Sequence, residues 1–534
     1  MERNEYDYVI VGGGTAGCAL AGRLAEAGHQ VALVEQGPPD DHPAIRDSRL
    51  SKLFALWRDK NYCRDYLMER APGDPSWPDV LRGVTLGGCG SINVMIHLRG
   101  NRQDFDHWRD LGNPGWGFDE MLAYFKRSET YEFGTSTWRG GDGPIKVRRV
   151  GKSIYADAFE RAAMEMGFYG PDWDFNGEQQ QGGAGPLQFS VDEKLRRSST
   201  VDYLQLSGDP DNPTRLTNHQ ALRLVFDECG NGQGQVPQVT GVAVLNPSTK
   251  TERVLHAQGE VILCCGTYET PKLLMQSGLG PPEHLCSFGI KPRKALPGVG
   301  QNLQDHVITS LFYQGAQPLP GLNFLSEIGL FVDIAPGKDL VFDRDGWPTV
   351  QFFMNAGVPE RRWVNMPENY FAFFPSLTRP KSMGEVRLAS PDPRRDPVID
   401  PRYYSHPDDL SIMVNALRLA QKMAGTQAFS GLNLGPISIA EPVPLPELTP
   451  QTPPAEMEVY VRAYSRGLWH PVGTCKMGPS SDPMAVVDHR LQVHGVSGLR
   501  ICDASIMPQI CCGNTNATVI AIAEKAADMI GRSA

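Results

Sequence analysis

The chain has 534 residues, a formal net charge of −10, and a composition that is 41% hydrophobic and 21% charged. Single hydrophobic cores stop growing at about 250–300 residues, so this length predicts two lobes. The composition is typical of a soluble globular protein. The acidic balance excludes a nucleic-acid partner, which needs a basic surface, and no apolar run is long enough to span a bilayer.

The start of the chain predicts a cytoplasmic protein, and this location bears on the cysteines. The first strand is expected to begin near Tyr6, which leaves no room for a signal peptide, although peripheral association with a membrane stays compatible with this. The eleven cysteines are therefore expected to be thiols. Cys264-Cys265 and Cys511-Cys512 lack zinc-ligand spacing, and no H-E-x-x-H motif occurs, so we expect no metal site.

The first predicted elements form a dinucleotide-binding unit. Residues 8–11 have the pattern of a buried strand, residues 19–27 that of an apolar helix, and residues 31–34 that of a second strand. Glu35 follows this second strand, where a carboxylate accepts hydrogen bonds from a ribose diol. This acid favours FAD or NAD over a 2′-phosphorylated cofactor.

The turn between the first strand and the helix has the spacing G-x-G-x-x-G. Gly12 allows the tight turn, Gly14 lets the backbone approach a pyrophosphate, and Gly17 permits close packing of helix against strand. Thr15 and Ala16 lie at the start of the helix, where free N–H groups and the positive end of the dipole favour phosphate. The context predicts a bound dinucleotide and leaves FAD and NAD as alternatives.

Two further glycine-rich segments follow. Residues 83–93 have no helix at the spacing of a phosphate loop, so a tight structural turn and a cofactor contact both stay open. In residues 266–280 we expect a short helix with Thr270 as N-cap, Pro271 as first helical residue and Gly278 past its end.

Strand-rich stretches are interleaved with the cofactor-type segments and predict a largely antiparallel sheet in a second lobe. The fold expected is α/β, with a Rossmann-type domain interleaved with an antiparallel-sheet substrate domain. The stretches are residues 143–149, 186–191, 307–313, 349–355 and 370–377. The expected division assigns residues 1–142, 196–305 and 455–534 to the cofactor domain, and residues 143–195 and 306–454 to the substrate domain.

Near the C-terminus, the proline-rich residues 441–454 exclude a helix or a central strand and are expected to return the chain to the cofactor lobe. Residues 455–466 then predict a helix that Gly467 ends. Trp469 and His470 follow on extended chain.

Five ordered blocks give the chain a resemblance to the glucose–methanol–choline (GMC) oxidoreductase family, from about residue 6 to about residue 530. They are the fingerprint at residues 12–17, the loop at 86–93, the segments 266–280 and 297–306, and the C-terminal motifs at 469–478 and 502–525. The resemblance implies FAD rather than NAD. It implies a FAD-dependent oxidase or dehydrogenase that acts on CH–OH groups.

The resemblance also implies site residues. His470 and Asn516 would face the reactive N5 edge of the flavin, a pair that resembles choline oxidase and hydroxymethylfurfural oxidase. Cofactor contacts are implied for Gly83, Leu86, Gly87, Gly88, Asn93, Asp503, Ala504, Asn514 and Thr515. Ile92 stands where choline oxidase-like relatives carry the histidine that bonds to the flavin, which implies non-covalent FAD.

The chemistry of alcohol oxidation agrees with these roles. Hydride leaves the carbinol carbon readily only as the hydroxyl loses its proton, and histidine has a pKa suited to accept that proton. An amide at Asn516 can hydrogen-bond the developing alkoxide, although Asn at such a position also serves as an ordinary helix N-cap. The remaining histidines, including His97 and His306, are expected to be surface or packing residues.

The expected reaction is oxidation of a neutral primary alcohol to an aldehyde, with oxygen or a quinone- or dye-type acceptor. Trp469 and Phe353 favour a planar substrate, whereas Glu327 could supply a counter-charge to a cation such as choline. The alternatives on the same fold are a hydroxynitrile lyase, a fatty acid photodecarboxylase, and a flavin-binding module without activity.

Overall fold

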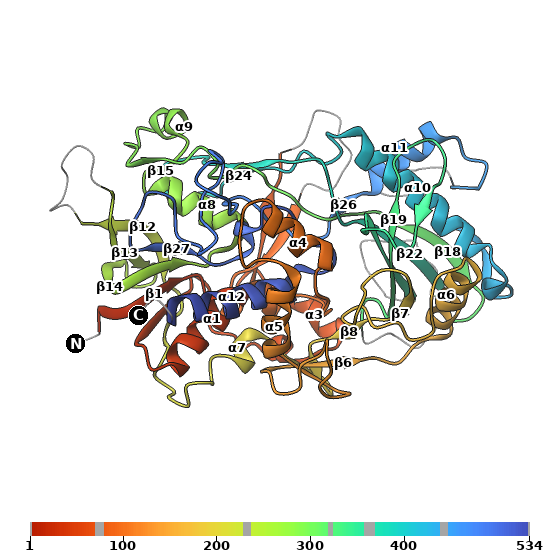
Figure 1. Ribbon diagram of the computed structural model, residues 1–534, viewed down its shortest axis with the longest axis horizontal. Helices are drawn as coiled ribbons and strands as arrows, with labels where there is room; N and C mark the ends of the chain where they lie inside the picture. The colour runs from red at the N-terminus through yellow and green to blue at the C-terminus, as the bar shows by residue number, and fades with distance from the viewer. Residues whose placement is uncertain are drawn as a thin grey trace.

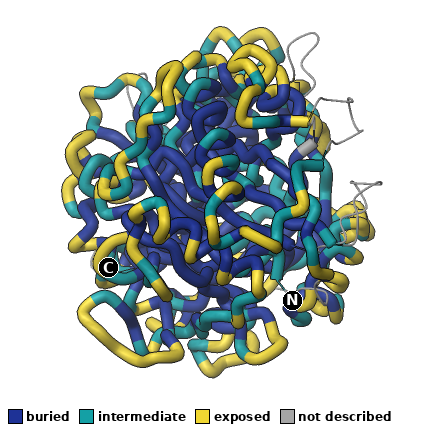
Figure 2. The backbone as a smooth tube through the Cα atoms, turned by 90° about the vertical axis from the view of Figure 1, so that its right-hand side faces the viewer, coloured by how far each residue is buried: buried dark blue, intermediate teal, exposed yellow. Residues whose placement is uncertain are grey.

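A computed structural model describes residues 3–69, 79–227, 236–318, 324–356, 369–437 and 447–531. The chain folds into two lobes, with the termini in the left-hand lobe of Figure 1. Each lobe has its own hydrophobic core, one around the first sheet and one around the second. Figure 2 shows the buried segments inside and the exposed ones around them. The expected fold class is confirmed.

The first lobe contains a seven-stranded sheet of order β11-β2-β1-β14-β13-β12, with β27 also paired to β14. The pairs around β1 and β27 are parallel, and β12, β13 and β14 run antiparallel. The strands are β1 Glu5–Val11, β2 Val31–Val34, β11 Thr214–Leu216, β12 Gln220–Phe226, β13 Val239–Asn246, β14 Thr251–Leu263 and β27 Leu499–Ile501.

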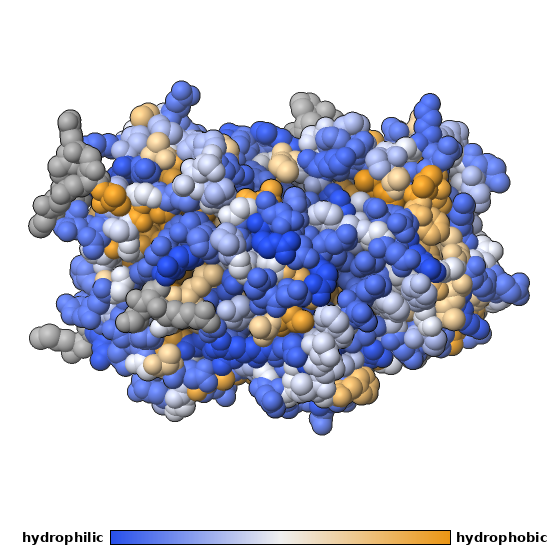
Figure 3. Space-filling model, in the orientation of Figure 1, coloured by the Kyte–Doolittle hydropathy of each residue, from blue (hydrophilic) through white to orange (hydrophobic). Residues whose placement is uncertain are grey.

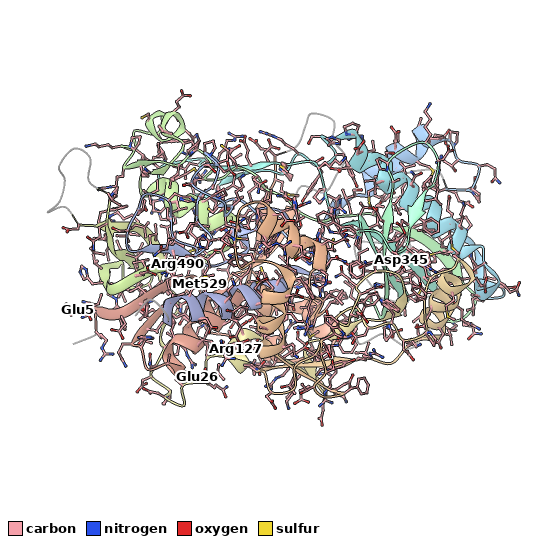
Figure 4. The ribbon with its side chains drawn as sticks, in the orientation of Figure 1. Glu5, Glu26, Arg127, Asp345, Arg490 and Met529 are labelled. Carbon is pink, nitrogen blue, oxygen red and sulfur yellow. The ribbon has the colours of Figure 1, made fainter. Side chains whose placement is uncertain are left out.

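Helices from both ends of the chain pack together in this lobe (Figure 1). Helix α1, Thr15–Glu26, contacts α12, Thr515–Gly531, which also packs on α5, Phe118–Ser128. Arg127, labelled in Figure 4, and Arg23 both pair with the fully buried Glu524 of α12. The other helices here are α4 Arg102–Asp110, α7 Ser199–Asp202, α8 Gly266–Gln276 and α9 Pro282–Ser287.

The second lobe contains a nine-stranded sheet whose pairs are antiparallel. Its order is β20-β19-β21-β22-β17-β26, with β18, β25 and β7 joined at the side. The strands are β7 Ala184–Pro186, β17 Val307–Ile308, β18 Leu311–Gly315, β19 Ile328–Ile334, β20 Phe342–Asp343, β21 Val350–Ala356, β22 Tyr370–Leu377, β25 Asn433–Pro436 and β26 Arg466–Gly467.

Expected strands at 349–355 and 370–377 are present, whereas the expected strands 186–191 and 307–313 are each divided into shorter ones. Helices α6, Ile154–Glu165, and α10, Pro407–Ala424, cover the sheet. Helix α11, Pro454–Tyr464, packs on α10 and adds its apolar side chains to the second core. We therefore propose that the second lobe extends to β26, beyond the boundary expected at residue 454.

Shorter elements connect the lobes and complete the surface. They are α2 Pro43–Arg46, α3 Leu50–Leu56, β3 Cys63–Leu67, β4 Asp79–Gly83, β5 Glu129–Tyr131, β6 Ile145–Arg149, β8 Gln188–Phe189, β9 Val191–Asp192, β10 Leu195–Arg196, β15 Leu279–Gly280, β16 Lys294–Ala295, β23 Glu385–Arg387, β24 Val398–Asp400 and the 3₁₀ turns η1 Gly88–Ser91, η2 Gln427–Phe429 and η3 Ala504–Ile506. Part of the proline-rich stretch 441–454 lies outside the described residues.

Figure 3 shows a face that is largely hydrophilic, with hydrophobic residues between the polar ones. Among the described residues, no helix combines the length and hydropathy needed to cross a membrane.

Helix α8 begins five residues before its predicted first residue, Pro271. Its first N–H group, at Gly266, donates to the Asp503 carboxylate at 2.8 Å, and the Thr270 hydroxyl donates to the same oxygen at 2.7 Å. The N-terminus of α8 is therefore capped by Asp503, a residue far away in the sequence. The prediction of Thr270 as the N-cap is wrong. Pro271 lies inside the helix, where its missing N–H leaves the Thr267 carbonyl free. That carbonyl accepts from the Thr474 hydroxyl at 2.6 Å.

Candidate active site

One large cavity lies at the boundary between the two lobes and is lined by residues of both. Among the predicted cofactor residues, those that line it are Gly12, Gly14, Thr15, Ala16, Glu35, Gly83, Gly88, Asn93, Asp503, Ala504, Asn514 and Thr515. Gly17, Leu86 and Gly87 do not line it. His470, Asn516, Trp469 and Phe353 line the same cavity, whereas Glu327 does not.

The glycine turn before α1 is built by close backbone contacts. Gly12 has φ +103°, and a Cβ atom there would lie 2.4 Å from the Cys264 carbonyl oxygen. A Cβ atom at Gly17 would lie 1.9 Å from the Gly12 carbonyl oxygen. At Gly14 the nearest such atom is 4.0 Å away, so its backbone faces open space at the start of α1. The turn is closely packed against the Cys264 carbonyl and its own backbone, and it is open on the side of the cavity.

Glu35 lies beside this turn, at the end of β2. Its carboxylate accepts hydrogen bonds from the N–H groups of Gly13, at 3.0 Å, and Gly37, at 2.8 Å. Burial raises the pKa of Glu35 to about 7 in spite of these donors. A ligand hydroxyl that reaches this carboxylate would add a donor and favour its ionised form.

The loop around η1 packs on the same turn. The N–H group of Gly87 donates to the Gly13 carbonyl at 2.6 Å, and a Cβ atom at Gly88 would lie 3.0 Å from the Cα atom of Gly14. Gly87 and Gly88 both have positive φ, at +89° and +52°. The loop is therefore a tight turn that also lines the cavity.

These residues fit an FAD. The open backbone at Gly14, the N-terminus of α1 and the buried Glu35 supply, in order, room for a pyrophosphate, positive potential and a ribose acceptor. Ile92 lines the cavity from the η1 loop. Its alkyl side chain has no group that can bond to a flavin.

The backbone that carries His470 is fixed from three sides. Trp469 has φ +63°, a left-handed conformation that costs a non-glycine residue about 1–2 kcal/mol. Its carbonyl accepts from the Arg82 guanidinium at 2.9 Å, and the His470 N–H group donates to the Asp305 carboxylate at 2.8 Å. The Leu468 N–H group donates to the His306 carbonyl at 2.7 Å. These bonds offset the strain at Trp469.

The imidazole of His470 contacts two polar side chains. Its Nδ1 atom lies 3.0 Å from Nδ1 of His306, and its Nε2 atom lies 3.2 Å from Nδ2 of Asn514. Burial, then His306 and Arg82, hold the pKa of His470 well below its ordinary value. The ring is therefore neutral at pH 7 and able to accept a proton.

The side chain in hydrogen-bond contact with His470 is that of Asn514. Helix α12 begins at Thr515, so Asn514 precedes the helix and Asn516 is its second residue. The carbonyl oxygen of the Asn516 side chain accepts from the Thr15 hydroxyl at 3.0 Å, which joins α12 to α1. The structure thus brings His470 and Asn514 together and directs the bonded oxygen of Asn516 toward the glycine turn.

His306 is a residue whose contact with the site the sequence did not reveal. It is fully buried, and its Nε2 atom lies 3.1 Å from the Cys511 carbonyl oxygen. Burial lowers the pKa of His306 to about 4, although the carbonyls of Cys511 and Thr378 oppose the shift. The motif Asp305-His306 was visible, but its contact with His470 spans 164 positions.

Aromatic side chains form the wall near His470. Trp469 packs edge to face on Trp57, with ring centroids 5.2 Å apart, and Trp57 contacts Phe54 at 5.2 Å. Phe353 and Phe374 lie opposite each other on β21 and β22 and also line the cavity. Trp57 was not singled out by the sequence.

Glu327 lies outside this wall. Its carboxylate accepts from the N–H group of Ser153 at 2.8 Å, just before α6. Burial raises the pKa of Glu327. Because the described carboxylates that line the cavity are Glu35, Glu269 and Asp503, all from the cofactor lobe, the aromatic wall has no acid of its own among the described residues.

Comparisons with known proteins agree with this arrangement. Two family models described as GMC oxidoreductase match residues 6–308 and 380–523. The oxygen-dependent choline dehydrogenase of Yersinia pseudotuberculosis serotype IB (strain PB1/+) is 35% identical over 550 residues, which cover 98% of this chain and 94% of that protein. That of Brucella canis is 35% identical over 558 residues, covering 99% and 96%.

Solved structures share the fold over the whole chain. Pyridoxine 4-oxidase from Mesorbium loti superposes with a TM-score of 0.84 at 29% identity, covering 98% of both chains. A formate oxidase superposes with a TM-score of 0.85 at 26% identity, covering 100% of this chain and 99% of the other.

The chain belongs to the GMC oxidoreductase family. It is an FAD-dependent oxidoreductase that acts on CH–OH groups.

Proposed function

We propose that this enzyme oxidises a neutral, aromatic primary alcohol to the aldehyde, with His470 as the base and Asn514 as the hydrogen-bond donor to the substrate oxygen. The contact between Nε2 of His470 and Nδ2 of Asn514 carries the proposal. A substrate hydroxyl that displaces this direct hydrogen bond can donate to the imidazole and accept from the amide. When bound, FAD supplies the acceptor for the hydride that leaves the carbinol carbon.

The tautomer of His470 follows from its partners. The Cys511 carbonyl can only accept, so Nε2 of His306 carries a hydrogen and Nδ1 of this neutral ring is an acceptor. Nδ1 of His470 therefore donates to Nδ1 of His306. The lone pair of His470 is left on Nε2, on the side of Asn514, where it can take the hydroxyl proton.

Asn514 supports the developing negative charge on the substrate oxygen. Its Nδ2 atom contacts Nε2 of His470 in the structure. Once a substrate hydroxyl takes that place on Nε2, the amide can donate to the substrate oxygen, and this bond strengthens as the oxygen becomes an alkoxide. The neutral His470, near the cation of Arg82, is partly buried and lines the cavity. These residues therefore act on the proton and on the charge of the oxygen.

The aromatic wall supports a planar, uncharged substrate. Trp469, Trp57 and Phe353 offer stacking surface, while Glu327 is committed to the N-terminus of α6. A quaternary ammonium group would enter this wall without a described carboxylate from its own side. For this reason we favour a benzylic or furanic alcohol over choline, the substrate named for the curated relatives.

We also propose that the FAD is non-covalent. Ile92 cannot form a bond to flavin, and His97 is buried beside Glu129, with Nε2 3.8 Å from its carboxylate, outside the cavity lining. Acid precipitation should release the yellow FAD into the supernatant, and flavin that stays with the pellet would contradict this. The acceptor we propose is oxygen or a quinone- or dye-type compound, distinguished by following hydrogen peroxide and dye reduction in parallel.

The experiment that tests the function is anaerobic mixing of the oxidised enzyme with benzyl alcohol, furfuryl alcohol or choline. We expect the aromatic alcohols to bleach the flavin spectrum, and their kcat/KM to exceed that of choline by more than tenfold. Glu327→Gln should leave this ratio unchanged. A kcat/KM for choline that exceeds those of the aromatic alcohols by more than about tenfold would overturn the proposed substrate class. If no alcohol bleaches the flavin spectrum, the lyase or photodecarboxylase chemistry is favoured.

A further inference from the structure

A buried amide lies in the part of the cavity wall that the second sheet forms. Asn355 lies on β21, is 5% exposed, and lines the cavity. Its Oδ1 atom is buried and has no hydrogen-bond partner in the structure. Buried side-chain oxygens in proteins are nearly always bonded, because an unbonded one loses its water without compensation. An unbonded acceptor on a residue that lines a cavity is therefore suited to a ligand that the side chain turns to meet.

The sheet register places Asn355 on the substrate wall. Side chains two residues apart on a strand share a face, so Asn355 lies on the same face as Phe353. Phe353 is opposite Phe374 in the register, and all three side chains line the cavity. Asn355 thus stands next to the aromatic surface on which a planar substrate would stack.

The neighbouring polar group does not compete for this role. The Ser326 hydroxyl, which also lines the cavity, is bonded to the Met354 carbonyl at 2.7 Å and to that of Ile328 at 3.1 Å. Its hydrogen is committed to the backbone. On the side of the second sheet, Asn355 is the described cavity-lining residue that has a buried polar atom without a hydrogen-bond partner.

We propose that Asn355 is a specificity-determining residue that binds a second hydrogen-bond donor on the substrate. The proposal rests on the proposed function, in which His470 and Asn514 hold the reacting hydroxyl. The favoured substrate class is then an aromatic primary alcohol that carries a further hydroxyl or N–H group. The amide accepts from that group through Oδ1, and the two phenylalanines contact the ring.

The test compares hydroxymethyl- with methyl-substituted benzyl alcohols, as the ortho, meta and para isomers. For each isomer the measured quantity is the ratio of kcat/KM for the hydroxymethyl compound to that for the methyl compound. We expect the wild-type enzyme to prefer the hydroxymethyl compound in at least one isomer. In Asn355→Leu, which keeps the size and removes the acceptor, this preference should fall roughly tenfold.

Two further variants control for packing and folding. Ser326→Ala removes a cavity-lining hydroxyl that is already bonded to the backbone, so it should keep the wild-type preference. Asn355→Ser keeps an acceptor in a smaller side chain and should keep part of the preference for the hydroxymethyl compound. FAD occupancy and Tm identify any variant that is misfolded. An equal loss for hydroxymethyl and methyl compounds in Asn355→Leu would overturn the proposal, because it would place Asn355 at the reacting hydroxyl or in packing alone.

Binding without turnover separates this proposal from the proposed function. In His470→Ala, dissociation constants for the same alcohols can be read from perturbation of the oxidised flavin spectrum. The hydroxymethyl compound should bind more tightly, and adding Asn355→Leu should remove the difference. If no alcohol is oxidised by the wild type, the proposed function fails on its own. Unchanged dissociation-constant ratios in the double variant would overturn the role of Asn355.

Discussion

The two lobes that meet at His470 present different surfaces to the cavity. The cofactor side is shaped by backbone, with Gly12 and Gly17 so close to neighbouring carbonyl oxygens that a side chain has no room. The substrate side is a sheet face whose side chains, such as Phe353 and Asn355, form the wall. Gly12 and Gly17 have no room for a side chain, whereas the side chains of the second surface can change while its fold is kept. Specificity is therefore expected to reside in the second lobe.

The largest effect is expected from substitutions in the glycine turn of the cofactor lobe. Gly17→Ala places a methyl group 1.9 Å from the Gly12 carbonyl, so we expect loss of soluble, flavin-loaded protein. Gly14→Ala meets nothing closer than 4.0 Å and should fold with lowered FAD affinity, because its methyl group occupies the open side of the turn. Circular dichroism and flavin content distinguish the two, and a fully loaded Gly17→Ala enzyme would contradict this account.

The next effect concerns the base where the two lobes meet. His470→Ala should lower kcat by roughly 10²–10⁴-fold, the range for a positioned general base, while FAD stays bound. His494→Ala is a suitable control, since its ring contacts the Gly478 carbonyl and does not line the cavity. Rapid-reaction measurement of flavin reduction reports the chemical step directly. Near-normal reduction in His470→Ala would exclude it as the base.

A smaller effect separates the two asparagines. Asn514→Ala should slow flavin reduction by roughly 10²–10³-fold, as for removal of one donor to a developing oxyanion. Asn516→Ala loses the bond to Thr15 and should mainly weaken FAD retention, with reduction of the loaded enzyme little changed. The opposite result, with the rate loss in Asn516→Ala, would restore the pairing predicted from the sequence.

The contrast between the lobes also explains what the sequence could predict. The turn at Gly12, Gly14 and Gly17 is local, so its spacing alone indicates its role. Alternation predicted the strands at 349–355 and 370–377, but the partners of Asn355 depend on a register that no local pattern contains. Phe353 was predicted as a substrate residue and lines the cavity, whereas Asn355 was missed.

Long-range contacts account for the other differences. The start of α8 is set by Asp503, which lies 237 residues away, and His306 reaches His470 across 164 residues. Asn514 and Asn516 belong to one short polar segment. Because α12 begins at Thr515, the two side chains point in different directions, and that of Asn514 contacts His470. Sequence reasoning identified the run but not the rotational position of each side chain.

The smallest expected effect is a change in the pH profile. His470 must be neutral to accept a proton, and its pKa lies well below 6.5 because burial, His306 and Arg82 disfavour the charged ring. Activity should therefore persist as the pH falls through 6.5, and the acidic limb of kcat/KM should lie below that value. Arg82→Gln removes a positive charge and keeps a donor for the Trp469 carbonyl, so it should raise the pKa of His470 and move the limb to higher pH. An acidic limb at or above pH 6.5 in the wild type, or a shift to lower pH in Arg82→Gln, would show that another group controls the profile.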